Sequence, residues 1–248
     1  MDLLRKGVAE LVGTAFLVAT VVGSGIFAQT LSEDAGLQLL ENTIATGAVL
    51  VALILALQPV SASFNPVVTL VELALGLVRS SVAGVLIACQ VVGGLLGTVV
   101  ANLMFELPAV SVSTNDRSSG AHWLAEVVAT IGLVLIVFGT VRSGRGHVVA
   151  FAVGGYITAA YWFTSSTSFA NPAVTVARSI SDTFAGIAPV AVLPFIGCQL
   201  LGGALAFALV RLLYPTLSAA DLPDPAASAH PSAASPATSS APSSEEIA

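Results

Sequence analysis

The residues of this chain best placed to do specific chemistry are two Asn-Pro pairs that interrupt apolar sequence. Asn is favoured as the residue that caps a helix and Pro is favoured at the first helical position, so each pair predicts a helix start. A capping Asn accepts a backbone N–H through its side-chain oxygen, which leaves its amide NH2 group free to donate. Each motif therefore presents hydrogen-bond donors inside apolar surroundings. The motifs are Asn65-Pro66-Val67 and Asn171-Pro172-Ala173.

Two carboxylates, Glu10 and Glu126, also lie within apolar stretches. A charged group inside a membrane is costly, which marks both as functional candidates. The alternative is a position near the membrane surface, because each lies close to the end of its stretch. No nucleophile, metal cluster or cofactor loop accompanies them, so catalysis, a metal and a cofactor are not expected. The histidines have no ligand spacing between them: His122, His147 and His230.

These residues must be positioned by helices in a membrane. Of 248 residues, 56% are hydrophobic and only 9% charged, and the mean hydropathy is +0.94. Such a chain has too little polar surface to dissolve as a globule, and nothing in its charges indicates nucleic-acid binding. A membrane-spanning helix needs ~20 mainly apolar residues. The sequence predicts six spans, at about residues 8–28, 42–58, 82–104, 122–141, 147–165 and 187–212.

Two shorter apolar pieces, at about residues 66–77 and 172–180, each begin at an Asn-Pro pair. They are too short to cross a bilayer, so the sequence predicts re-entrant half-helices. The cysteines, Cys89 and Cys198, lie inside predicted spans, where thiols act as small packing residues and a disulfide is not expected. Residues 218–248 are rich in Ala, Ser and Pro without apolar periodicity, which predicts a disordered tail.

Basic residues predict the orientation, because they are enriched on the cytoplasmic side of membrane proteins. With both termini and the tail in the cytoplasm, six basic residues face the cytoplasm and only Arg117 and Arg178 lie on the outer side. The six are Arg5, Lys6, Arg79, Arg142, Arg145 and Arg211.

The chain also contains an internal repeat, since three markers recur in the same order. A single domain is predicted at residues 1–217, with halves at about 5–105 and 120–214. Each half holds three predicted spans, and because this number is odd, the halves enter the membrane from opposite sides. The half-helices would then meet at the midplane, and small residues at 93, 97, 202 and 206 would let the halves pack closely. The markers are Ala9-Glu10 with Ala125-Glu126, the Asn-Pro motifs with their preceding Ser and Phe, and Cys89-Gln90 with Cys198-Gln199.

Across about residues 5–214 the sequence resembles the aquaporin family, also called major intrinsic proteins. The resemblance rests on the paired motifs, the Ala-Glu-x-x-Gly-Thr opening of the first span and the repeated Gln-x-x-Gly. It implies a homotetramer of six-helix channels with two half-helices, an all-α membrane fold. It also implies that Glu10 and Glu126 accept backbone N–H groups of the re-entrant loops. The second motif and the segment 156–163 are similar to a bacterial branch linked with arsenic-resistance operons, which implies the inner membrane of a bacterium.

In such a channel, Asn65 and Asn171 would present donors to one point of the lumen. A water molecule there accepts from both and turns its hydrogens outward, which interrupts proton transfer along the water chain. The positive ends of both half-helices oppose cations and protons. Val67, which replaces Ala of the family motif, is expected to alter midplane packing slightly.

The sequence departs from many family members directly after the second motif, where Val174 replaces an Arg of the narrowest point. Arg178 lies four residues later, on the same helix face one turn farther out. One hypothesis gives Arg178 part of the filter role, displaced outward. The other places it at the outer interface, paired with Asp182.

The resemblance places the other filter positions at Thr46, at Ala159 or Ala160, and at Ser168. A lumen of such small side chains predicts passage of uncharged solutes such as glycerol or undissociated arsenous acid. The lipid bilayer is the expected surroundings of the protein. The main hypothesis is a passive channel for water and these solutes that excludes protons and ions. The alternatives are an ion-coupled secondary transporter, which also uses inverted repeats and broken helices, and a membrane junction protein with a closed pore.

Overall fold

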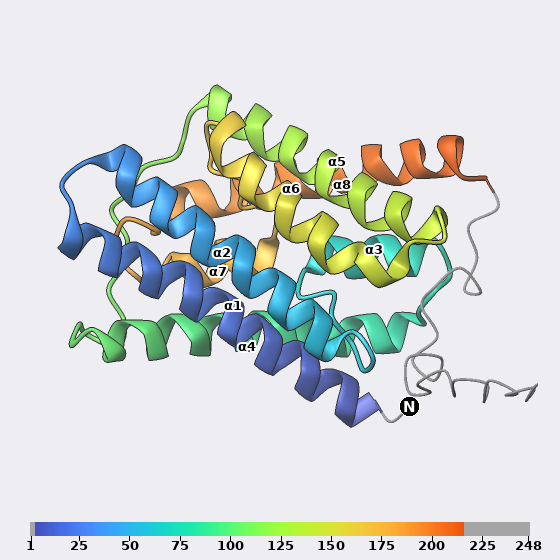
Figure 1. Ribbon diagram of the computed structural model, residues 1–248, viewed down its shortest axis with the longest axis horizontal. Coiled ribbons are helices and arrows are strands. Elements are labelled where there is room, and N and C mark those ends of the chain that lie inside the picture. The colour runs from blue at the N-terminus through green and yellow to red at the C-terminus, as the bar shows by residue number, and fades with distance from the viewer. Residues whose placement is uncertain (1–2, 216–248) are drawn as a thin grey trace, which may run out of the picture.

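The computed structural model describes residues 3–215, which form eight α-helices and one short 3-10 helix (Figure 1). The longer helices run along the long axis of the molecule, and the short helices α3 and α7 lie between them in opposite halves. The predicted tail and His230 lie outside the described residues. The elements are α1 (Leu3–Leu31), α2 (Ala35–Leu57), α3 (Pro66–Ala74), α4 (Ser80–Met104), α5 (Gly120–Arg142), η1 (Gly146–Val148), α6 (Val149–Phe163), α7 (Pro172–Arg178) and α8 (Pro189–Leu213).

Five of the six predicted spans are helices long and apolar enough to cross a membrane alone: α1, α2, α4, α5 and α8. The remaining span, α6, has only 15 residues. The 3-10 turn η1 precedes it without a break, and together they reach roughly 28 Å, close to the thickness of a bilayer core. The chain leaves α6 at Thr164, whose extended backbone leads into the second re-entrant loop.

Helix boundaries differ from the sequence prediction where capping decides them. Helix α2 begins at Ala35 instead of about residue 42, because the side chain of Asp34 accepts the N–H of Leu37 and caps it. Helix α3 ends at Ala74 rather than about residue 77. Gly76, with φ of +76°, takes the left-handed conformation that terminates a helix.

The packing of the helices repeats between the two halves. Helix α1 packs against α2 and α4, and α5 packs against α6 and α8 in the same way. Each half-helix contacts the last long helix of both halves, because α3 packs on α4 and α8, and α7 packs on α8 and α4. Helices α2 and α6, which are equivalent in the two halves, pack on each other. The structure therefore carries the inverted repeat predicted from the sequence markers.

Close contact between α1 and α4 depends on two glycines one turn apart. A Cβ atom on Gly93 would lie 2.2 Å from the carbonyl oxygen of Leu11, and one on Gly97 would lie 2.2 Å from that of Ala15. Only glycine fits at such distances, so the predicted close packing at these positions is confirmed.

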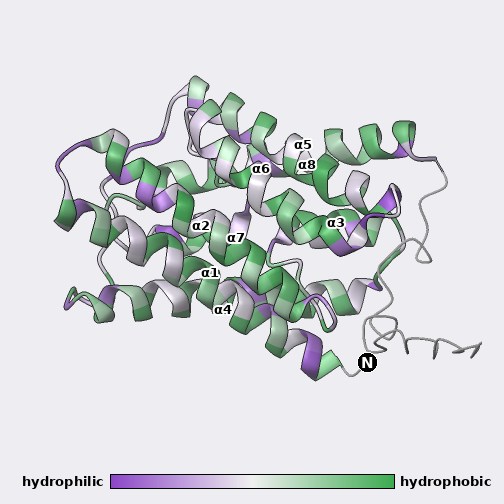
Figure 2. Cartoon of the chain, viewed as in Figure 1, coloured by the Kyte–Doolittle hydropathy of each residue, from purple (hydrophilic) through white to green (hydrophobic). Residues whose placement is uncertain are grey.

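The outer surface of the bundle is apolar. Hydrophobic residues line the long helices, and hydrophilic residues gather mostly at helix ends and in connecting loops (Figure 2). Large side chains such as Phe16, Leu124 and Leu193 are exposed along the helices, whereas buried polar residues occupy the interior. This distribution suits a lipid environment, where backbone polar groups must be satisfied within the protein.

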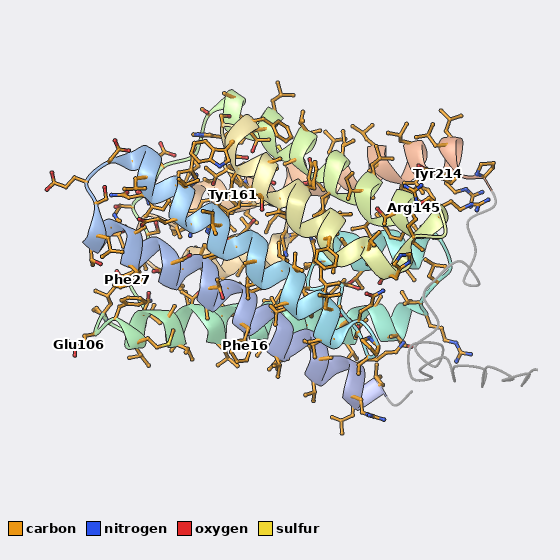
Figure 3. The ribbon with its side chains drawn as sticks, viewed as in Figure 1. Phe16, Phe27, Glu106, Arg145, Tyr161 and Tyr214 are labelled. Carbon is orange, nitrogen blue, oxygen red and sulfur yellow. The ribbon has the colours of Figure 1, made fainter. Side chains whose placement is uncertain are left out.

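The two ends of the described chain lie on the same side of the bundle. The start of α1 and the end of α8 are both at the right of Figure 1. Arg145 and Tyr214 lie at that end, and Glu106 lies at the opposite end (Figure 3). Helix α3 is in the half nearer the chain ends, called here the inner half, and α7 is in the other, outer half.

Candidate functional site at the junction of the half-helices

The two Asn-Pro motifs meet and bond to each other. The side-chain amide nitrogen of Asn65 donates to the carbonyl oxygen of Ala170 at 2.7 Å, and that of Asn171 donates to the carbonyl oxygen of Phe64 at 2.7 Å. Each side-chain oxygen caps its own helix. That of Asn65 accepts the backbone N–H of Val67, and that of Asn171 accepts mainly the backbone N–H of Ala173. One amide hydrogen of each Asn is thus used by the opposite motif, and the second remains to donate.

The residue before each Asn has an unusual backbone conformation. Phe64 has φ of 47° and Ala170 has φ of 46°, both in the left-handed region that non-glycine residues rarely adopt. These are the residues whose carbonyl groups accept the amides from the opposite motif. Such a conformation costs about 1–3 kcal/mol per residue and persists only when its surroundings hold it.

Glu10 holds the first loop in this conformation. It is fully buried and accepts the backbone N–H groups of Ser63 and Phe64 at 2.9 and 2.7 Å. The side-chain amide of Gln90 donates to Glu10 at 2.8 Å and to the hydroxyl of Thr69 at 3.0 Å. The carboxylate therefore connects α1, the loop and α4.

Glu126 has the same contacts in the second half. It is also fully buried and accepts the N–H groups of Phe169 and Ala170 at 2.9 and 2.8 Å. Gln199 donates to Glu126 at 2.6 Å and to the hydroxyl of Thr175 at 2.8 Å. Both carboxylates have the contacts that the family resemblance implies, and both are buried inside the helix bundle.

Gln90 and Gln199 were identified from the sequence only as markers of the repeat, and Thr69 and Thr175 were not singled out. The signal for their role was present, because both Gln-x-x-Gly segments and both Asn-Pro-x-Val-Thr segments recur at matched places. What was not evident is that each Gln bonds a Thr of the half-helix and the loop-supporting Glu at once.

A cavity of about 700 Å³ runs past this junction and is lined by both Asn side chains. At its inner mouth it is lined by Lys6, Ser63 and Glu72. At its outer mouth it is lined by Arg178 of α7 and by Ser168 and Phe169 of the preceding loop. Apolar residues line much of the wall between, including Leu17, Val21, Leu50, Ile54, Leu133, Val153 and Ile157.

Thr46 lines the outer part of the cavity, but the two alanines predicted opposite it do not. Ala159 is exposed on the outside of the bundle, and Ala160 is buried against other helices. Tyr161 takes their place, because the α6 face toward the cavity carries every fourth residue up to this one. Its hydroxyl lies 3.2 Å from that of Thr46, and Figure 3 shows it in the half nearer Glu106.

Ser168 and Val174 both line the outer mouth. Among the described atoms, the buried hydroxyl oxygen of Ser168 has no hydrogen-bond partner, so it is available to a solute. The small side chains expected beside Arg178 are not the whole wall at this level, since Tyr161 adds an aromatic ring.

Arg178 is buried, with 2% of its surface exposed, and it lines the cavity. Its guanidinium carbon lies 3.5 Å from the ring centre of Phe169, and its Nε atom donates to the carbonyl oxygen of Ala185. Asp182 instead accepts the backbone N–H and hydroxyl of Thr114 at 2.8 and 3.0 Å. The hypothesis of an interfacial Arg178 paired with Asp182 is therefore wrong.

Val67 is buried beside Gly203 of α8. A Cβ atom added to Gly203 would lie 2.5 Å from the Cγ1 atom of Val67. The glycine provides the room that the larger side chain of Val67 needs at the junction. Pro66, Pro172 and Ala173 are buried in the same junction, each in the first turn of its half-helix.

Comparisons with known proteins agree with this architecture. The family model described as "Major intrinsic protein" matches residues 1–168. The chain is similar to Aquaglyceroporin AqpS of Rhizobium meliloti (strain 1021), with 51% identity over 214 residues that cover 86% of this chain and 91% of that protein. Its fold is similar to that of the aquaglyceroporin from Plasmodium falciparum, with a TM-score of 0.67, 16% identity and coverage of 86% of this chain and 98% of that chain.

Proposed function

The chain belongs to the major intrinsic protein family, and on that premise we propose that it is a passive channel for water and small uncharged solutes. Glycerol and undissociated arsenous acid are the solutes proposed, and protons and ions are excluded. The observation that carries the proposal is the pair Asn65 and Asn171, which bond across the junction and line one cavity. The name of the similar Rhizobium protein, an aquaglyceroporin, supports the same class of permeant.

Proton exclusion follows from the remaining donors of the two Asn side chains. A water molecule between them accepts from both, so its own hydrogens point away along the pore in both directions. A chain of water molecules then has no continuous donor-to-acceptor order at this point. The positive N-terminal end of α3 adds to the barrier against cations.

Solute selection is assigned to the outer mouth. Thr46 and Ser168 offer hydroxyl groups, Val174 offers an apolar surface, and Tyr161 limits the width. Arg178 acts as a filter residue one turn farther out than in many family members. Its stacking on Phe169 and its burial hold the charge in place at the cavity wall. Hydroxyl and guanidinium donors beside an apolar wall suit solutes with several hydroxyl groups.

An ion-coupled transporter is not favoured. A transporter of that kind uses an ionisable group at its midplane site. The two side chains at the junction are amides, and the charged residues that line the described cavity, Lys6, Glu72 and Arg178, lie toward its mouths. The protein thus acts by conducting solutes passively.

The proposal extends to the whole protein and its setting. Residues 1–217 form one channel domain of two inverted repeats, and the predicted tail at 218–248 lies outside the described residues. Four copies assemble as a tetramer in the inner membrane of a bacterium, with both termini in the cytoplasm. Both described chain ends lie on one side of the bundle, as an arrangement with both termini in one compartment requires.

Stopped-flow light scattering on proteoliposomes tests the function, with water, glycerol and arsenous acid as separate permeants. Thr46→Trp fills the outer cavity and should reduce glycerol and arsenous acid entry to the level of empty vesicles. Ile44→Trp, at an exposed position of the same helix, is the matched control and should conduct as the parent does. A parent protein that conducts none of the three permeants would overturn the proposal.

A further inference from the structure

The half-helices carry opposite charges at matched positions. Glu72 is the seventh residue after Asn65, and Arg178 is the seventh residue after Asn171. Each lies in the last turn of its half-helix, and each lines the same cavity. At matched positions of the inverted repeat, the first half therefore has a carboxylate at the inner mouth, and the second half has a guanidinium group at the outer mouth.

The charges nearest to each side chain preserve this contrast. Glu72 lies near the carboxylate of Glu10 and the ammonium group of Lys6. Arg178 lies near Arg117 and the carboxylate of Glu126. A second carboxylate thus accompanies Glu72, and a second guanidinium group accompanies Arg178.

Glu72 is not placed where its charge favours folding. It lies near the C-terminal end of α3, where the helix dipole is negative, and beside a second carboxylate. Glu10 accepts hydrogen bonds from Ser61, Ser63, Phe64 and Gln90. By contrast, among the described residues Glu72 accepts hydrogen bonds from a single group, the hydroxyl of Ser63, which lies 3.1 Å from both of its carboxylate oxygens.

The junction itself creates a need for such a charge. A constriction with only hydrogen-bond donors rejects cations and protons but attracts small anions, and Arg178 attracts them further. Among the described residues that line the cavity, Glu72 is the acidic one. We propose that Glu72 is a specificity-determining residue that excludes small anions at the inner mouth, while Arg178 excludes cations at the outer mouth. This inference rests on the proposed channel function.

Nitrate entry into proteoliposomes tests the inference, because nitrate keeps its charge at every pH used. Valinomycin lets potassium follow, so swelling in potassium nitrate reports nitrate permeability by light scattering. The parent should match empty vesicles. Glu72→Gln should raise nitrate entry roughly tenfold or more, as the loss of a charge beside a narrow passage predicts, with water and glycerol entry within about twofold of the parent.

Two further variants separate charge from structure. Glu72→Asp keeps the charge and should keep nitrate out. Glu33→Gln removes an exposed carboxylate between α1 and α2 that does not line the cavity, and it should leave every flux unchanged. Entry of water and glycerol at the parent rates shows that Glu72→Gln has folded, because both fluxes need an intact junction.

The outcomes are distinct. If Glu72→Gln conducts water and glycerol but excludes nitrate as the parent does, the inference is wrong and the proposed function stands. If all three fluxes change together, Glu72 shapes the pore and is no charge filter. A parent that conducts neither water nor glycerol overturns the proposed function and the inference with it.

Discussion

At the scale of residues, the junction depends on two Asn side chains, each of which uses its oxygen and its amide group for different hydrogen bonds. Asn65 and Asn171 each use the oxygen to cap a helix and one amide hydrogen to bond the opposite loop. The sequence predicted the cap but left both hydrogens free, because a bond to the opposite motif cannot be seen in either motif alone. One donor from each Asn is still sufficient to orient a water molecule.

Val174 lines the cavity at the position where many family members carry an Arg, so substitutions there test the proposed filter. Val174→Arg would add a second guanidinium at the outer mouth, one turn inward from Arg178 on the same face of α7. We expect glycerol and arsenous acid entry to fall roughly tenfold while water entry falls much less, because a narrower polar filter excludes the larger solutes first. Stopped-flow measurements with the three permeants check this.

Val174→Leu is the control for that change, since it adds volume without charge. It should reduce the entry of the larger solutes only slightly. Equal glycerol entry through the Val174→Arg variant and the parent would contradict a filter at this position.

At the scale of elements, close contact between helices keeps the loops in register with their supporting carboxylates. Glu10 is on α1 and Gln90 is on α4, so the bonds between them require the short distance that Gly93 and Gly97 allow. The same arrangement holds between α5 and α8, where a Cβ atom on Gly202 would lie 2.7 Å from the carbonyl oxygen of Val127. Helix contact and loop geometry are therefore linked.

Gly93→Ala tests this link. The new Cβ atom would lie 2.2 Å from the carbonyl oxygen of Leu11, which forces α1 and α4 apart. We expect a loss of about 1–3 kcal/mol in the free energy of unfolding, typical of an overpacked contact, together with reduced water entry. Circular dichroism during thermal unfolding in detergent measures the first effect.

Gly84→Ala provides the matched control in the same helix. A Cβ atom there meets nothing within 4 Å, so only the higher helix propensity of Ala remains, worth roughly 0.5–1 kcal/mol. This variant should unfold at the same or a slightly higher temperature. A Gly93→Ala protein as stable as Gly84→Ala would show that α1 and α4 do not depend on this contact.

At the scale of the whole molecule, much of the fold could be predicted because apolar length and repetition are properties of the sequence alone. The spans, the half-helices and their inverted relation follow from those two features. The helix face of α6 did not follow, and Tyr161 was missed, because its span is apolar on every side and gives no periodicity to read. The match between Glu72 and Arg178 was missed, because it appears only when both half-helices line one cavity.

The proposed orientation can be tested by labelling on intact cells. In a background with Cys89→Ala and Cys198→Ala, Glu33→Cys lies between α1 and α2 and Ser143→Cys lies between α5 and α6, both at exposed positions. A membrane-impermeant maleimide should label the first variant directly and the second only after permeabilisation. The reverse pattern would place the termini outside.

The reciprocal amide bonds have a consequence for how the protein is made. The carbonyl group of Phe64 and the amide of Asn65 have their partners at Asn171 and Ala170, which leave the ribosome more than a hundred residues later. Unpaired polar groups are unfavourable in lipid, so the first half waits in the membrane incomplete. The junction therefore forms only after the second half has been synthesised, so a chain that ends before Asn171 cannot build the constriction.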